Sequence, residues 1–219
     1  MLCSVYSLEI LYKENALNTR LSYLCVPCEQ SEKGMEFNMD VLFQLTDKDF
    51  GLEPKEMKVY KLRIAARGMV LRDDGKIAIQ YKTQKNEYKL VGGGMEENED
   101  PQMAFKREVL EEAGCEVEIV EELGTTEEYR SRKNVKQISH IFVGKVTKDT
   151  HVFNLDEEEK LEGAELVWLT PEEALKAIKD CYDVILPSEF DDIYTTRFVV
   201  LRDSKILEYY LSRGKKDEQ

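Results

Sequence analysis

The stretch that decides the fold is residues 93–115, which read GGMEENEDPQMAFKREVLEEAGC. Within it, Glu108, Glu111 and Glu112 have the spacing i, i+3 and i+4. A helix places residues with this spacing on one face, within an arc of about 100°, where like charges raise one another's pKa unless a cation lies among them. Because carboxylate oxygens are hard ligands, this face suits Mg²⁺ or Mn²⁺.

The limits of this helix are also readable from the sequence. Asp100 can cap the first free backbone N–H groups and Pro101 fits the first helical position, which predicts a start near residue 101. Gly114 is placed to end the helix in a left-handed conformation, and the glycines at 92–94 allow the backbone to approach a phosphate or a metal ion. Two apolar strips flank the acidic edge, one of Phe105, Val109 and Ala113 and the other of Met103 and Leu110. We therefore expect the helix to pack from two sides with its acidic edge open.

The same residues carry a family resemblance. In order, the pattern contains Gly93, five residues, Glu99, seven residues, Arg107-Glu108, two residues, Glu111-Glu112, one residue and Gly114. It resembles the Nudix box without a gap, and the resemblance implies an α/β/α sandwich with a mixed β-sheet. The alternative is a solvated acidic helix face, which explains neither the glycines nor Arg107.

The resemblance also implies roles for individual residues. In the family, the glutamates that match Glu108, Glu111 and Glu112 bind divalent metal ions, here Mg²⁺ with Mn²⁺ as a substitute, and a backbone carbonyl, here that of Gly92, often joins them. The arginine that matches Arg107 orients the neighbouring carboxylates. The glutamate that matches Glu99 supports the loop or an additional metal ion. The general base is often a residue on a later loop, where the candidates are Glu157, Glu158, Glu159 and Glu162.

Substrate contacts are less well specified. Arg63 and Arg67 could contact phosphates, Tyr88 could stack on a base, and Gly93 would lie against the ligand. The alternative is that the two arginines are exposed strand residues and that Tyr88 is an aromatic residue at the edge of the core. Val91 replaces the proline that many family members have before the glycine pair. Two marks of family subclasses are missing as well. No proline follows about fifteen residues past the box, which weakens an ADP-ribose assignment, and Tyr129 comes too early for a dinucleoside polyphosphate hydrolase.

Composition limits the class of partner. The chain has 219 residues, 42% of them hydrophobic, and a formal net charge of -13, which indicates a soluble folded protein and argues against nucleic acid or an anionic membrane as a partner. Five scattered cysteines and the lack of a signal peptide predict a cytoplasmic location. Cys25 and Cys28 have CxxC spacing, but no second pair or nearby histidine supports a metal role.

The pattern along the chain predicts an N-terminal extension at 1–57, a Nudix-like domain at 58–214 and a disordered tail at 215–219. The extension is read as a loosely packed segment, or as a cap for the pocket or a dimer. Expected strands lie at 41–45, 59–71, 77–81, 88–91, 116–129 (interrupted near Gly124), 136–146 and 165–169, and expected helices at 101–113, 171–180 and 196–212. Residues 47–54 and 156–160 are expected to be loops.

Three functions are consistent with these observations. The first is a Mg²⁺-dependent Nudix hydrolase that cleaves a nucleoside diphosphate linked to another group, above all a modified nucleoside triphosphate such as 8-oxo-dGTP. The second is a nucleotide-sugar or ADP-ribose pyrophosphatase. The third is a Nudix-like module that senses a nucleotide without cleaving it, although such a module has no need for an intact metal cluster. The resemblance also implies a homodimer, since family members are often dimers.

Overall fold

The computed structural model describes residues 40–56 and 59–214 of the chain. The chain divides into two compact units, Met1–Val41 and Leu42–Gln219, and the architecture below is that of the second unit. This unit begins before the expected domain boundary at residue 58. The cysteine pair at 25 and 28 and the expected tail lie outside the described residues. No helix in the described part of the chain combines the length and the apolar character needed to cross a membrane.

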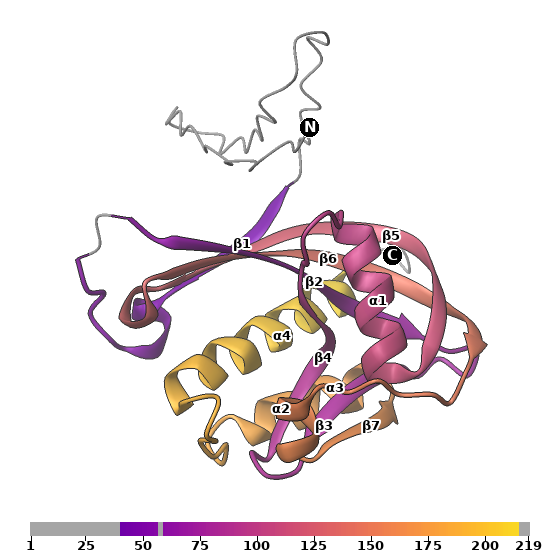
Figure 1. Ribbon diagram of the computed structural model, residues 1–219. Coiled ribbons are helices and arrows are strands. Elements are labelled where there is room, and N and C mark those ends of the chain that lie inside the picture. The colour runs from indigo at the N-terminus through magenta and orange to yellow at the C-terminus, as the bar shows by residue number, and fades with distance from the viewer. Residues whose placement is uncertain (1–39, 57–58, 215–219) are drawn as a thin grey trace, which may run out of the picture. The chain divides into compact units, whose positions relative to one another are not determined.

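One mixed sheet of seven strands forms the centre of the described chain, in the order β1-β5-β6-β2-β4-β3-β7 (Figure 1). The strands are β1 (Val41–Thr46), β2 (Lys61–Leu71), β3 (Ile77–Lys82), β4 (Glu87–Gly94), β5 (Cys115–Arg130), β6 (Val135–Asp149) and β7 (Ala164–Leu169). β2 and β6 run parallel, whereas β2–β4, β3–β4, β3–β7 and β5–β6 are antiparallel. The register of β5 against β6 shifts between Glu122 and Gly124, which confirms the predicted interruption.

Four α-helices accompany the sheet in the described residues: α1 (Pro101–Ala113), α2 (Glu157–Leu161), α3 (Pro171–Cys181) and α4 (Ile193–Gly214). The predicted limits of α1 are confirmed, because Asp100 accepts a hydrogen bond from the Met103 N–H and Gly114 has a left-handed φ of 62°. The prediction of a loop at 156–160 is wrong, since Asp156 and Glu159 cap each other reciprocally and start α2. Residues 47–50 of the other expected loop form a short 3₁₀ turn.

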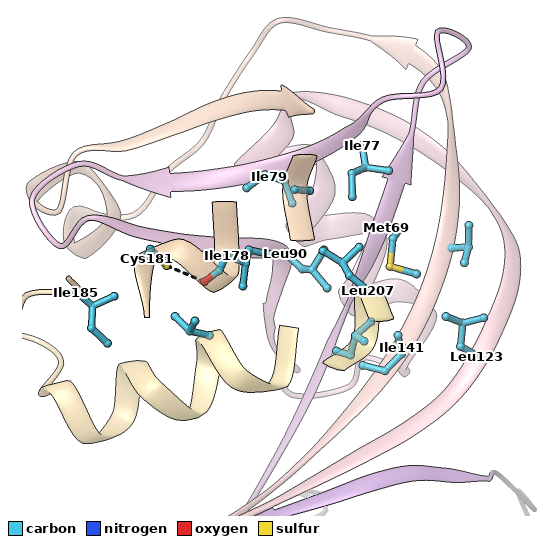
Figure 2. Packing of buried hydrophobic residues seen from close by; sticks show 14 residues of the cluster. Met69, Ile77, Ile79, Leu90, Leu123, Ile141, Ile178, Cys181, Ile185 and Leu207 are labelled. Atoms are coloured by element: carbon cyan, nitrogen blue, oxygen red, sulfur yellow. Dashed lines mark hydrogen bonds between the residues drawn. The ribbon is translucent and has the colours of Figure 1, made fainter. Parts of the chain in front are cut away.

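Successive side chains of a strand point to opposite faces of the sheet, so each face carries its own apolar cluster. In β3, Ile77 and Ile79 belong to the cluster under α3 and α4, whereas Ala78 belongs to the cluster under α1. Figure 2 shows Leu90 of β4 and Ile178 of α3 within the first cluster. Each large apolar side chain buried in this way stabilises the fold by about 1.5–3 kcal/mol. The helices therefore enclose the sheet from both faces, which confirms the predicted α/β/α sandwich.

Helix α1 differs from expectation in one respect. Phe105 and Val109 are fully buried against the sheet, but Met103 is 54% exposed and Leu110 is 42% exposed. The expectation that this helix packs from two sides is therefore wrong, because α1 contacts the sheet with a single apolar face.

Candidate active site

A cavity of about 490 Å³ lies where the acidic edge of α1 meets the ends of several strands. Its walls come from both sides of the sheet, because α1 lies on one face and α4 on the other. Strands β2, β3, β4 and β5 contribute polar side chains to it, and α2 closes a further side. A volume of this size suits a nucleotide-sized ligand.

The glycine turn at the end of β4 separates two kinds of side chain. A Cβ atom at Gly93 would lie 2.5 Å from Oε1 of Glu108, and one at Gly94 would lie 3.2 Å from Nη2 of Arg63. Gly92 has a φ of 135°, and its Cβ would lie 2.5 Å from Cα of Arg67. Position 92 therefore requires glycine, because of its φ and its contact with backbone, whereas a side chain at 93 or 94 would press on the ends of Glu108 or Arg63.

Arg107 holds the acidic edge of α1 in place. Its Nε and Nη2 donate to the two carboxylate oxygens of Glu99 at 2.7 and 3.0 Å, and Nη1 donates to Glu108 at 2.9 Å and Glu111 at 3.0 Å. Nη2 also donates to the carbonyl oxygen of Gly94 at 2.9 Å. The hydrogen bonds that Arg107 donates to Glu99 lower the pKa of Glu99 and raise the pKa of Arg107. One planar guanidinium group thus ties three carboxylates to the glycine turn.

Glu112 is the most deeply buried carboxylate of the helix, with 4% of its surface exposed. It accepts hydrogen bonds from the Gly92 N–H at 2.7 Å and from the Lys89 ammonium group at 2.9 Å. Burial raises the pKa of Glu112 to about 7, and this outweighs the opposing charge of Lys89. Burial also raises the pKa of Glu108, against the hydrogen bond from Arg107.

Glu159 of α2 completes this wall of the cavity. Its carboxylate accepts a hydrogen bond from Gln80 at 3.0 Å and is hydrogen-bonded to Glu112. Burial would raise the pKa of Glu159, but the hydrogen bond with Glu112 and the charge of Lys89 lower it. The pKa values of these two neighbouring carboxylates are therefore shifted in opposite directions. We call Glu108, Glu112 and Glu159 the carboxylate wall.

The carboxylate wall is the part of the cavity that could hold a divalent ion. Glu108, Glu112 and Glu159 all line the cavity and offer hard oxygen atoms, and the Lys89 ammonium group already occupies a cationic position against Glu112. Glu99 and Glu111 do not line the cavity and are instead bound to Arg107.

A second acidic group lies nearby, and two buried lysines pair with its carboxylates. Carboxylate oxygens of Glu158, Glu162 and Asp191 lie within 4.8 Å of one another. Lys82 contacts Glu162 at 2.5 Å, and the fully buried Lys85 contacts Asp191 at 3.2 Å. These lysines make the group a buried ion network that joins β3 to α2 and to the segment before α4.

The predicted substrate contacts are placed differently. Arg63, Arg67 and Gly93 line the cavity, and burial lowers the pKa of Arg67 to about 9. Tyr88 is not among the lining residues; its ring stacks on Tyr81 with centroids 4.2 Å apart.

The sequence did not indicate the five other cationic residues that line the cavity, which are Lys82, Lys89, Arg130, Lys133 and Arg202. Their role depends on contacts between distant segments, and no local spacing signals it.

Comparisons with known proteins agree with the resemblance to the Nudix family. The model of a family described as the NUDIX domain matches residues 61–187. A "MutT-like protein" of Streptomyces ambofaciens is 27% identical over 128 residues, which are 58% of this chain and 77% of the relative. Among solved structures, a NUDIX hydrolase from Nitrosomonas europaea has 18% identity and a TM-score of 0.44, covering 57% of this chain and 90% of its own. The E. coli ORF135 protein has 24% identity and a TM-score of 0.38, covering 56% and 83%.

Proposed function

Since this chain belongs to the NUDIX domain family, whose model matches residues 61–187, we propose that it is a Mg²⁺-dependent hydrolase of diphosphate bonds. Its substrate is a nucleoside diphosphate linked to another group. Within that class we place modified nucleoside triphosphates such as 8-oxo-dGTP first. The observation that carries the proposal is the carboxylate wall, which meets the glycine turn inside a cavity of about 490 Å³.

The glycine turn and the nearby cations hold the diphosphate. The backbone at 92–94 carries no side chain that would keep a phosphate away, and Lys89, Arg63 and Arg67 line the same cavity. In a chain with a net charge of -13, these local cations and a divalent ion supply the attraction that a polyanionic substrate needs. The ion would be held by Glu108 and Glu112, and when bound it neutralises the negative charge that develops on the phosphate oxygens.

The chain's own residues then direct the attack of water. The water oxygen forms a bond to phosphorus, the bond from phosphorus to the bridging oxygen breaks, and its electron pair leaves with the departing phosphate. We assign the proton of the water to Glu159, which lines the cavity and is oriented by Gln80. Arg107 acts by positioning, because it fixes Glu108 while standing outside the cavity lining.

Product analysis tests the proposal. The purified chain is incubated with nucleoside triphosphates, 8-oxo-dGTP, nucleotide sugars, ADP-ribose and dinucleoside polyphosphates, with Mg²⁺, Mn²⁺ or EDTA. Metal-dependent formation of a nucleoside monophosphate and pyrophosphate supports a triphosphate substrate. Two monophosphates from a sugar nucleotide would move the assignment to that class. Tight binding without turnover of any compound would contradict the proposal and favour a sensing module.

A further inference from the structure

Four arginines gather on the part of the cavity away from α1. They are Arg63 and Arg67 on β2, Arg130 on β5 and Arg202 on α4, and we call them the arginine cluster. Two carboxylates lie among them, and both are engaged. Glu128 accepts from Arg130 at 2.8 Å and from Arg202 at 3.4 Å, and Asp203 accepts from Arg202 at 2.7 Å. Among the described residues, the four arginines are therefore in hydrogen-bond contact with two carboxylates.

The remaining donors of the cluster lack anionic partners. Arg202 is 1% exposed and its Nη2 has no hydrogen-bond partner among the described residues; the same holds for Nε of Arg130, which is 8% exposed. Arg63 donates to the neutral amide of Gln137 at 2.5 Å, and Arg67 donates to the hydroxyl group of Ser139 at 3.3 Å. Buried guanidinium groups that are left without partners are costly, so such donors mark a place for a ligand.

The contrast with the lysine network supports this reading. There, Lys82 and Lys85 face Glu87, Glu162 and Asp191, so carboxylates outnumber the cations. The chain as a whole carries 44 acidic against 31 basic residues. A purely structural arginine cluster in so acidic a chain would readily find carboxylate partners. Its unpartnered donors instead suit a phosphate monoester, which carries about -1.5 to -2 charges at pH 7.

We infer that the arginine cluster is a phosphate subsite that works without metal and holds a phosphate group of the substrate other than the one attacked. This inference rests on the proposed function, which places the diphosphate that is cleaved at the carboxylate wall. Gly93 adjoins Glu108 and Gly94 adjoins Arg63, so a ligand at the carboxylate wall extends directly toward the cluster. Guanidinium forks bind phosphate oxygens in pairs, which suits a second phosphate better than a neutral sugar or base.

Two sources could supply this phosphate. It is either the terminal phosphate of a triphosphate chain or a phosphate monoester on the organic half of the substrate. The chemistry of the subsite is the same in both cases, and the ligands in the experiment separate them.

The test is equilibrium binding by titration calorimetry in EDTA. The ligands are AMP, ATP and adenosine 3′,5′-bisphosphate, and inorganic phosphate is used in parallel thermal unfolding. We expect at least one of the two larger nucleotides to bind about tenfold or more tightly than AMP, and inorganic phosphate to raise the melting temperature. Tighter binding of ATP alone would identify the terminal phosphate of a triphosphate as the bound group. Tighter binding of the bisphosphate would identify a phosphate monoester on the organic half of the substrate. Equal affinity for all three nucleotides would overturn the inference.

Variants separate binding from structure. Arg202→Gln should remove most of the tenfold preference, and Arg63→Gln, at an exposed position, should reduce it without loss of fold. Arg72→Gln is the matched control, because Arg72 directly follows β2 but pairs with Asp74 and does not line the cavity. A lower melting temperature in Arg202→Gln with an unchanged preference for the second phosphate in both variants would show a structural role and refute the subsite. Because no step needs turnover, this outcome is independent of whether the chain hydrolyses a given diphosphate.

Discussion

The two sides of the cavity are built in opposite ways. Glu108 and Glu112 of the carboxylate wall come from one helix, and they meet a glycine turn that precedes it closely in the chain. The arginine cluster draws on β2, β5 and α4, so Arg63 and Arg202 meet only after the sheet and the last helix have packed. One side holds carboxylates whose charge calls for a cation, and the other holds surplus positive charge. From this difference we propose that the reaction takes place at the first side and that the second side selects the substrate.

Removing the central carboxylate should have the largest effect. We expect Glu112→Gln to reduce the turnover number by at least about 1,000-fold, because the change removes a charged oxygen ligand from the carboxylate wall. Glu116→Gln is the control, since Glu116 is exposed and pairs with Lys148 at 2.7 Å. Steady-state kinetics with Mg²⁺ measures both variants. Unchanged turnover in Glu112→Gln with an intact fold would contradict the assignment of the wall.

The two sides should also differ in how they respond to pH without metal. The pKa of Glu112 is raised from 4.5 to about 7 in the folded protein, so the folded state binds the proton more tightly than the unfolded state. Its contribution is therefore fully present below pH 4.5 and is lost as the pH rises toward 7, a decrease of about 3 kcal/mol in the free energy of unfolding.

Urea unfolding in EDTA between pH 5 and pH 8 measures this decrease. Glu112→Gln should flatten the curve, whereas Arg202→Gln should leave its slope unchanged, because arginine does not titrate in this range. The same slope in wild type and Glu112→Gln would place the titrating group elsewhere.

Glu159 should have a different role from Glu108 and Glu112 within the carboxylate wall. As the proton acceptor, it should contribute about 100-fold to the turnover number, at the lower end for a general base. The measurement is the pH dependence of turnover for Glu159→Gln beside Glu157→Gln, whose carboxylate is 91% exposed. We expect the acidic limb of the profile to disappear only in the first variant; its persistence there would assign the base to another residue.

Positioning should matter less than direct contact. Arg107→Gln frees Glu108 and Glu111 from their fixed orientation, and we expect a loss of about 10- to 100-fold in turnover or metal affinity. Arg107→Lys should not restore activity, because an ammonium group cannot reproduce the planar fork. Full activity in the lysine variant would show that charge alone is needed.

Local signals explain why the box helix could be predicted and the arginine cluster could not. The cap at Asp100 and the left-handed Gly114 depend on residues that are neighbours in sequence, and the structure has both. By contrast, the contact between Arg202 and Glu128 joins α4 to β5. An arginine in a helix gives no sign of such a partner. Tyr88 shows the same limit, since its stacking partner Tyr81 lies on the neighbouring strand.

The sequence alone also did not show which glutamate of an acidic segment reaches the cavity. The segment around Glu159 contains several glutamates that are equivalent by sequence, yet only the packing of α2 brings Glu159 to Glu112 while Glu162 pairs with Lys82. The sequence offers several glutamates as candidates for the base, and the tertiary contacts place Glu159 beside Glu112.

Direct binding of Mn²⁺, measured by electron paramagnetic resonance in the absence of nucleotide, tests the division of the cavity most directly. We predict that the wild-type chain binds Mn²⁺, that Glu112→Gln weakens this binding by about tenfold or more, and that Arg202→Gln leaves it unchanged. Equal Mn²⁺ affinity in the wild type and Glu112→Gln would contradict the claim that the carboxylate wall is the metal side of the active site.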